Sequence, residues 1–314
     1  MSSTILHQAV IMLFLIIVGV LCHRIGIISE KGSRELSKLV LNIVNPVVIF
    51  LAYQTDFKAE LIKGFVSALI LSVIAYIIAI AVSYFLIRRK KESETDIERF
   101  SCIYSNCAFM GIPLIQSIMG YEGVFYLTAF LTVFNILVWT HGVIQISGIK
   151  SFKFIIEAFT SPAIIAVALG LILFIARLRL PALLIDSLEF ISAMNTPLAM
   201  IVAGATIART NIINALKNPR IYYVTALTLV IIPLIIGGFF RLIPMNEPSE
   251  LAVLIAMSAP AAAMCTMQCL NYSKNSIYAS EIFAVTTLLS TLTMPMIVYI
   301  YKPVSYTHLR AHET

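Results

Sequence analysis

The sequence contains little charge, because only 12% of its 314 residues are Asp, Glu, Lys or Arg. A typical soluble domain contains about 25% of such residues, so the shortage excludes a water-soluble fold of this length. Apolar residues take their place: 60% of the chain is hydrophobic and the mean hydropathy is +0.94. The composition therefore predicts an all-α integral membrane protein.

The sequence also lacks the patterns of common catalytic and metal sites. It has no HExxH, no GxSxG and no matched pair of aspartates within its hydrophobic runs. Its cysteines lie in or beside those runs, without the close loop pairs of a disulfide framework or a zinc site. They are Cys22, Cys102, Cys107, Cys265 and Cys269. We therefore expect no enzyme activity and no metal or other cofactor, with an intramembrane enzyme as the less favoured alternative.

Ten hydrophobic runs approach the length of about 20 residues that a membrane-spanning helix needs. They cover residues 5–23, 36–53, 61–87, 100–119, 123–147, 160–178, 183–207, 220–242, 250–270 and 279–301. The first run is not expected to be a cleaved signal sequence, because Met1 to Gln8 carries no Lys or Arg and no small-residue cleavage site follows. We predict ten transmembrane helices.

The distribution of Lys and Arg among the loops predicts the orientation. Fifteen of them fall in loops on one side of the predicted spans and six on the other, with Arg310 set aside. Loops rich in Lys and Arg face the cytoplasm, so both termini are expected on the non-cytoplasmic side of the cell inner (plasma) membrane. The net charge of +6 thus indicates contact with a lipid bilayer and not with nucleic acid.

Two polar stretches are too short to form separate soluble domains. The longest charged linker, Arg88 to Arg99, is expected to be a solvated inner loop, with a lipid or regulatory site as the alternative. The last residues, Val304 to Thr314, resemble the translation of a common sequencing-library adapter, and we interpret them as a non-native tail. The oligomeric state stays open, with a homodimer as one alternative.

Two pairs of prolines indicate an internal repeat. Asn45 and Pro46 in the second run correspond to Asn195 and Pro197 in the seventh, with the prolines 151 positions apart. A second pair, in the fourth and ninth runs, is separated by 147 positions. Similar offsets predict two five-helix units, residues 1–151 and 152–303. Since five is odd, the second unit must cross the membrane upside down, as in the inverted repeats of many transporters.

The stretch Ser105 to Gln116, SNCAFMGIPLIQ, places an amide, a glycine and a proline inside the fourth run. Pro113 has no backbone N–H and its ring clashes with an earlier carbonyl, which costs an intact helix about 3 kcal/mol. Gly111 adds backbone freedom. We therefore expect this helix to unwind near Phe109 to Pro113.

The ninth run contains an echo of that stretch, Met257 to Gln268, MSAPAAAMCTMQ, with Pro260 inside it. If the two runs cross in opposite directions, the N-termini of two half-helices meet near the midplane. Each N-terminus carries about +0.5 of a charge and stabilises an anion by about 0.3 to 1 kcal/mol. Asn106 is our candidate ligand, because its amide offers two donors and one acceptor. The alternative is an amide that only holds the break to a neighbour.

Further candidates lie in other runs. Asn45 and Asn195 are expected either to contact a substrate or to brace the crossing, and Pro46 and Pro197 predict kinks. A coupling ion would need a charged or titratable group within or near the spans. The candidates for that role are Asp186, Glu189, Glu281 and His141.

The stretch SNCAFMGIPLIQSIMGYEGVFYLTAFLTVFNILVW, with the Asn-Pro of LNIVNPVVIF and the Ser-Pro at Pro162, resembles the auxin efflux carrier family in its bacterial branch. The resemblance covers residues 1–303. It implies ten spans in two inverted five-helix repeats, a scaffold domain, a transport domain, and crossed broken helices in the fourth and ninth spans. It also implies that Asn106 matches the substrate-binding asparagine of the family, and that Pro113 and Pro260 mark the crossover.

The resemblance also bears on the substrate. Ala261 stands where plant members carry a glutamine, so small dicarboxylates such as malate or malonate are favoured over auxin. The complete set of predicted substrate-binding residues is Asn106, Gly111, Pro113, Pro260, Ala261, Asn45 and Asn195. We predict a secondary transporter that exports small organic anions by alternating access, on a scaffold made largely of spans 1, 2, 6 and 7. A passive anion channel is the alternative.

Overall fold

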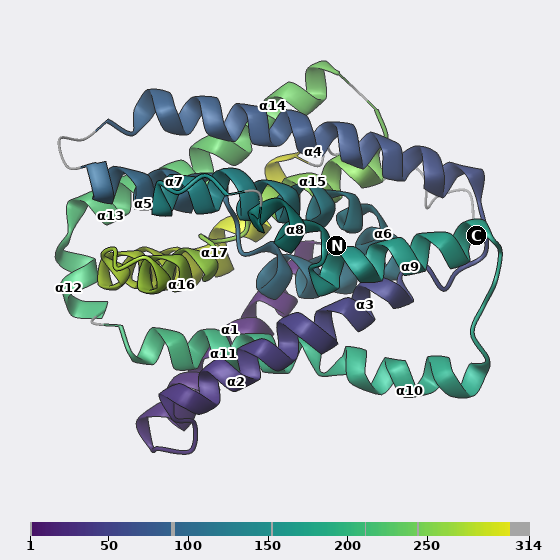
Figure 1. The fold of residues 1–314 in the computed structure, drawn as a ribbon, viewed down its shortest axis with the longest axis horizontal. Helices are drawn as coiled ribbons and strands as arrows, with labels where there is room; N and C mark the ends of the chain where they lie inside the picture. The colour runs from purple at the N-terminus through teal and green to yellow at the C-terminus, as the bar shows by residue number, and fades with distance from the viewer. Residues whose placement is uncertain (1, 89–91, 152, 211, 244, 302–314) are drawn as a thin grey trace.

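The computed structural model describes residues 2–88, 92–151, 153–210, 212–243 and 245–301. Within these ranges the regular elements are α-helices and short π-helices (Figure 1). The described residues also contain one isolated antiparallel bridge, between Ser105 and Ala261. The prediction of an all-α protein is confirmed. The tail at residues 304–314 lies outside the described residues.

The first half of the chain contains seven α-helices and three π-helical segments among its described residues. They are α1 (Ser2–Arg24), α2 (Glu30–Leu39), η1 (Val40–Val44), α3 (Asn45–Leu51), α4 (Ala59–Leu86), α5 (Glu92–Ile103), η2 (Cys107–Gly111), α6 (Ile112–Leu137), η3 (Val138–Gly142) and α7 (Val143–Ser147).

The second half contains ten α-helices and one π-helical segment over the part that the structure describes. They are α8 (Lys153–Phe159), α9 (Pro162–Ile175), α10 (Ala182–Ala193), α11 (Asn195–Ala208), α12 (Ile212–Lys217), α13 (Pro219–Ala226), η4 (Leu227–Ile231), α14 (Ile232–Leu242), α15 (Glu247–Ser258), α16 (Met264–Asn271) and α17 (Ser276–Tyr301).

Five continuous helical stretches in the described residues are long and apolar enough to cross a membrane. They are Ala59–Leu86, Cys107–Ser147, Ala182–Ala208, Pro219–Leu242 and Ser276–Tyr301. The second has 41 residues, which at 1.5 Å per residue is about 60 Å, or twice the thickness of a bilayer core. It is interrupted at Gly120, whose φ of 62° suits glycine and few other residues. This stretch is therefore too long for a single crossing.

Prolines follow three of the π-helical segments found in the described chain. Pro46, Pro113 and Pro233 each stand two residues after the end of η1, η2 and η4. In each case the residue before the proline bonds five residues back, as Ile112 N–H does to the Cys107 carbonyl. The wider turn gives room for a proline ring that would clash in a regular α-helix. These prolines are therefore accommodated without ending their helices.

The helices pack in two groups. α1, α2, α3, α9, α10 and α11 contact one another, and α4 to α7 pack with α13 to α17. Figure 1 shows α2, α10 and α11 along the lower edge of the molecule and α4 and α14 along the upper edge. Contacts of α1 and α11 with α17, and of α6 with α1 and α9, join the groups.

The contact between α1 and α11 depends on glycine. A Cβ atom on Gly204 would lie 2.0 Å from the carbonyl oxygen of Ile16, and one on Gly19 would lie 2.2 Å from that of Ile201. Small residues allow two membrane helices to approach this closely, and dispersion then holds them together. The two backbones therefore form a tight, reciprocal contact.

An ion pair joins the beginning of α2 to the end of α11. Arg209 Nη1 lies 3.4 Å from Glu30 Oε1, and Arg34 hydrogen bonds to the same carboxylate oxygen. The hydrogen bond from Arg34, with the charges of Arg34 and Arg209, holds the pKa of Glu30 below its usual value. The carboxylate of Glu30 is therefore charged at neutral pH.

The charged linker Arg88 to Arg99 is not a solvated loop along its whole length, and that prediction is wrong for its second half. α5 begins at Glu92, and Ile97 and Glu98 are both 0% exposed. Glu98 is tolerated there because Arg220, 122 positions away in sequence, binds its carboxylate. A local reading of the charges could not include that partner.

Candidate functional site

Two helices that lie far apart in sequence are interrupted. The first break covers residues 104–106, between α5 and η2, and the second covers residues 259–263, between α15 and α16. The first break precedes the expected position near Phe109 to Pro113, because the chain is helical again from Cys107. Pro260 does lie inside the second break. We call residues 104–106 and 260–262 the crossover.

The two halves of the crossover exchange backbone hydrogen bonds. The N–H of Asn106 donates to the carbonyl of Pro260 at 2.6 Å, and the N–H of Ala262 donates to the carbonyl of Tyr104 at 2.9 Å. These two bonds flank the bridge between Ser105 and Ala261. Backbone groups released by the breaks therefore satisfy one another, as a membrane interior requires.

Two hydroxyl groups complete this pairing. Ser105 Oγ donates to the carbonyl of Ala256 at 2.6 Å, and Thr286 Oγ1 of α17 accepts from the N–H of Ala261 at 3.2 Å. Ser105 belongs to the stretch that the sequence singles out. Thr286 was missed, because only the fold brings α17 beside the second break.

Helix N-termini lie on both sides of the crossover. η2 begins at Cys107, directly after the first break, and α16 begins at Met264, directly after the second. Each N-terminus presents backbone N–H groups and about +0.5 of a charge. The paired breaks therefore bring two partial positive charges to one place, where an anion can be bound without a lysine or arginine.

The amide of Asn106 lies at this place. Asn106 is 6% exposed, and its Nδ2 has no hydrogen-bond partner among the described residues. A buried donor without a partner costs about 1–3 kcal/mol. Such a group is typical of a site completed by a ligand or a water molecule.

Asn45 contacts the helix that follows the first break. Its Nδ2 lies 3.4 Å from the carbonyl oxygen of Ala108, while its Oδ1 has no partner in the described structure. Pro113 explains why that carbonyl is available, because the residue five positions after Ala108 in this π-helical turn lacks an N–H. Asn45 thus braces η2 with its donor and leaves its acceptor free.

Asn195 and Gly111 lie apart from those contacts. Asn195, at the start of α11, is 1% exposed, and neither atom of its amide has a described partner. Pro197 follows in the first turn of α11, just after the helix is interrupted at Met194. Gly111 ends η2, where an added Cβ would lie 3.3 Å from Cys107 Cβ. α11 packs against η2, so Asn195 is on a helix that borders the site.

The family profile described as membrane transport protein matches residues 4–298 of the chain. The chain belongs to that family. It is the auxin efflux carrier family, so the resemblance in the sequence is confirmed.

Two archaeal relatives agree with this assignment. An uncharacterized transporter of Methanothermobacter thermautotrophicus is 23% identical over 293 residues, which cover 90% of this chain and 94% of the relative. An uncharacterized transporter of Methanocaldococcus jannaschii is 22% identical over 289 residues, covering 88% and 92%. The chain is therefore a membrane transport protein with several membrane-crossing helices.

The four coupling candidates of this membrane transport protein occupy different environments. Asp186 and Glu189 are exposed on α10, and Glu281 is half-buried near the start of α17. His141 lies in η3, where its Nδ1 is 2.8 Å from the hydroxyl of Tyr104. Because the carbonyl of Tyr104 belongs to the crossover, His141 is the candidate that the structure connects to it.

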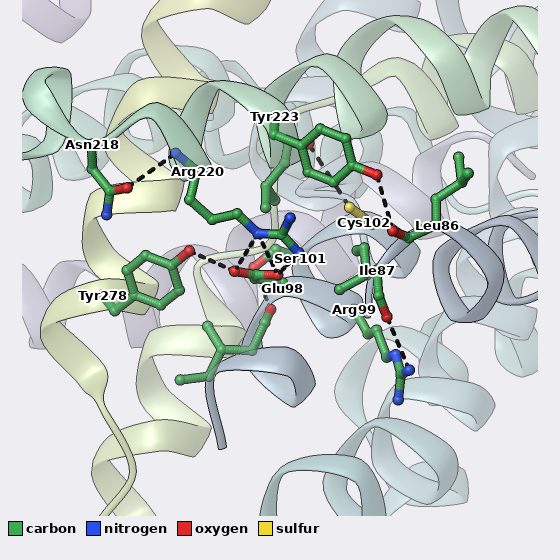
Figure 2. A network of polar contacts seen from close by, with 12 residues as sticks. Leu86, Ile87, Glu98, Arg99, Ser101, Cys102, Asn218, Arg220, Tyr223 and Tyr278 are labelled. Atoms are coloured by element: carbon green, nitrogen blue, oxygen red, sulfur yellow. Dashed lines mark hydrogen bonds and ion pairs between the residues drawn. The ribbon is translucent and has the colours of Figure 1, made fainter. Parts of the chain in front are cut away.

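A buried ion pair lies along α5, the helix that leads into the first break. Arg220 of α13 donates from Nε to both oxygens of Glu98, at 3.0 and 3.1 Å, and from Nη2 to Oε2 at 2.7 Å. The hydroxyl of Tyr278 on α17 donates to Glu98 Oε1 at 2.8 Å. Figure 2 shows these side chains converging on Glu98 from α13 and α17. One carboxylate thus ties α5 to two other helices.

Neighbouring residues cap the end of α4. Arg99 Nη2 donates to the carbonyl of Ile87 at 3.0 Å, and the hydroxyl of Tyr223 donates to that of Leu86 at 2.9 Å (Figure 2). These bonds satisfy carbonyls that a helix end leaves without intrahelical donors. In the described ranges no group of three or more His, Cys, Asp or Glu is placed to hold a metal ion.

Proposed function

We propose that the protein is a secondary transporter of small organic anions, which bind at the crossover. The observation that carries the proposal is the meeting of two helix N-termini beside the buried, unpartnered amide donor of Asn106. Partial positive charges and neutral donors stabilise a carboxylate without the desolvation cost of a buried cation. Small dicarboxylates such as malate or malonate, or auxin-like carboxylates, are the substrate class.

The pairing of the breaks supports two inverted five-helix repeats, residues 1–151 and 152–303, with ten spans. In one backbone bond of the crossover the first segment donates and the second accepts, and in the other bond the donor and acceptor segments are reversed. A pseudo-two-fold axis would require this reciprocity. α5 and α15, which lead into the breaks, are both 12 residues long. The bridged residues Ser105 and Ala261 are 156 positions apart, in place of the 147 expected from Pro113 and Pro260, so Ala262 and not Val253 is the counterpart of Asn106.

Alternating access would move the group of α4 to α7 and α13 to α17, which contains the crossover, against a scaffold of α1, α2, α3, α9, α10 and α11. Polar contacts between the two groups include Asn45 with Ala108 and Tyr121 with Ser192 at 3.3 Å. Both termini lie outside the inner membrane in this proposal. A membrane potential of 100 mV, negative inside, would favour efflux of an anion by about 2.3 kcal/mol per charge. We assign the coupling proton to His141, through its hydrogen bond with Tyr104.

The burial of the crossover supports a carrier over a passive channel. Ser105 is 3% exposed, Asn106 is 6% exposed and Ala261 is 1% exposed. A counterflow experiment separates the two functions. Faster uptake of labelled dicarboxylate into vesicles preloaded with unlabelled dicarboxylate is expected of a carrier, and uptake that preloading leaves unchanged would point to a channel.

Substitution of Asn106 tests the binding site. The Nδ2 of Asn106 has no hydrogen-bond partner among the described residues, so Asn106→Ala removes no such bond and should not lower the unfolding temperature of the purified protein. The same variant should lose the thermal stabilisation that malate or malonate gives the wild type. Asn135→Ala is the matched control, because Asn135 Nδ2 bonds within its own helix at 2.8 Å. If Asn106→Ala binds these anions as the wild type does, Asn106 is not a ligand.

A further inference from the structure

A second cavity lies outside the crossover, between α14, α15 and α17. Its volume is about 110 Å³. Along α14 its lining residues recur every three or four positions from Pro233 to Arg241, so they form one face of that helix. Eight residues of helix extend about 12 Å. The cavity is therefore an elongated groove along α14, closed on its other side by Ile297 and Ile300 of α17.

The groove lies on an apolar surface. Leu234 and Ile300, which line it, are 41% and 43% exposed, and Tyr299 beside it is 73% exposed. On a membrane transport protein, exposed apolar helix faces contact lipid tails. Gly238 leaves the groove open, since an added Cβ there would meet nothing within 4 Å. The shape suits an unbranched chain lying against α14.

One end of the groove carries a fixed cation. Arg241 in the last turn of α14 donates from Nη2 to the carbonyls of Ile300 and Tyr301, both at 2.8 Å. Among the described residues its Nε and Nη1 have no partner, and the side chain is exposed. Two of its neighbours therefore hold the guanidinium in place while most of its donors remain available.

The buried carboxylate that contacts Tyr301, that of Glu250, does not form an ion pair with this arginine among the described residues. Glu250 accepts from the Tyr301 hydroxyl at 2.5 Å and from the Met245 N–H at 2.7 Å. Over the described part of the chain it forms no ion pair with Arg241. The groove thus combines an apolar trough with an uncompensated guanidinium at its end, which matches an acyl chain joined to a phosphate.

We propose that this groove binds one anionic phospholipid, with the phosphate on Arg241 and an acyl chain along α14 over Gly237 and Gly238. Lipid tails are as apolar as the groove, so packing and not the hydrophobic effect holds the chain. The charge of Arg241 supplies the preference for an anionic headgroup. The site is separate from transport, and no step of anion binding at the crossover depends on it.

Native mass spectrometry of the full-length protein, delipidated and then titrated with phosphatidylglycerol or phosphatidylcholine, tests the proposal. The wild type should retain phosphatidylglycerol more tightly. Gly238→Leu fills the groove and should reduce retention of both lipids several-fold. Arg241→Gln should reduce the preference for phosphatidylglycerol by about fivefold, which corresponds to about 1 kcal/mol for one basic residue at a membrane surface.

Two controls separate the groove from general surface effects. Ile235→Phe adds bulk to α14 at a side chain that is 43% exposed and does not line the groove, and Arg177→Gln removes an exposed positive charge elsewhere. Both should behave as the wild type. Equal retention of the two lipids by the wild type, or an unchanged preference in Arg241→Gln and unchanged retention in Gly238→Leu, would overturn the proposal. So would a variant ending at Tyr301 that binds lipid where the full-length chain does not, because the occupant would then be the chain's own last residues.

Discussion

Replacing Arg220 with methionine should destabilise the protein more than replacing its partner Glu98 with glutamine. The reason is unequal burial: Glu98 is 0% exposed, whereas the side chain of Arg220 is 24% exposed. Arg220→Met leaves a fully buried carboxylate without its guanidinium partner, which costs about 3–5 kcal/mol. Glu98→Gln leaves a guanidinium that reaches water and keeps an acceptor for Tyr278, so we expect a loss of about 1–3 kcal/mol.

The double variant Glu98→Gln with Arg220→Met sharpens the test. It removes both charges, and well-packed neutral replacements of a buried ion pair are often nearly neutral. The double variant should therefore be more stable than Arg220→Met alone by about 2 kcal/mol, so its loss is smaller than the sum of the two single losses, as expected of residues in contact. Two independent residues would instead give additive losses.

Equilibrium unfolding of the purified variants in detergent measures these differences. Arg99→Met is the matched control, because Arg99 is the next residue of α5 but donates to the carbonyl of Ile87 and lies with Cζ 4.2 Å from the centre of the Tyr84 ring. Its loss should be about 1 kcal/mol and independent of Glu98. A larger loss in Glu98→Gln than in Arg220→Met, or additive losses in the double variant, would refute the reasoning.

Two further predictions concern other parts of the protein. Gly204→Ala places a Cβ 2.0 Å from the Ile16 carbonyl oxygen and should lower the free energy of unfolding by about 1–3 kcal/mol. Gly238→Ala is the control, because its Cβ meets nothing within 4 Å. Equal unfolding temperatures of the two variants would contradict the close contact of α1 and α11. His141→Gln should abolish the pH dependence of dicarboxylate transport between about pH 5 and 8. The variant should still bind dicarboxylate at neutral pH. An unchanged pH profile of transport would exclude His141 as the proton site.

Hydrophobic run lengths predicted the helical class and most helix positions, because the length of a membrane span is fixed by the bilayer. Pro113 and Gly111 in the fourth run, and Pro260 in the ninth, predicted a break in each. The exact place of the first break was not predictable from Pro113, because a π-helical turn accommodates that proline, and the irregular backbone lies instead at residues 104–106. Proline chemistry alone does not say which of these two outcomes occurs.

Partners distant in sequence account for what sequence reasoning missed. Thr286 is one of many hydroxyl residues in the tenth run, and only its position beside Ala261 distinguishes it. Glu98 lies in a charged stretch whose composition indicates solvent, and its burial depends on Arg220 and Tyr278. By contrast Asn106, an amide within an apolar run, could be singled out because such a group needs a polar partner wherever it lies.

The exchanged bonds of the crossover also limit how the protein can move. Sliding either segment of the crossover past the other by one residue would break both backbone hydrogen bonds at once. Each unsatisfied backbone group in a membrane interior costs several kcal/mol. Thermal energy is about 0.6 kcal/mol, so the two segments of the crossover are expected to stay paired and not to separate from each other. Any relative motion is then expected at interfaces where whole helices slide past one another. The helical segments that flank the two breaks, α5, η2, α15 and α16, are therefore expected to move as one rigid unit.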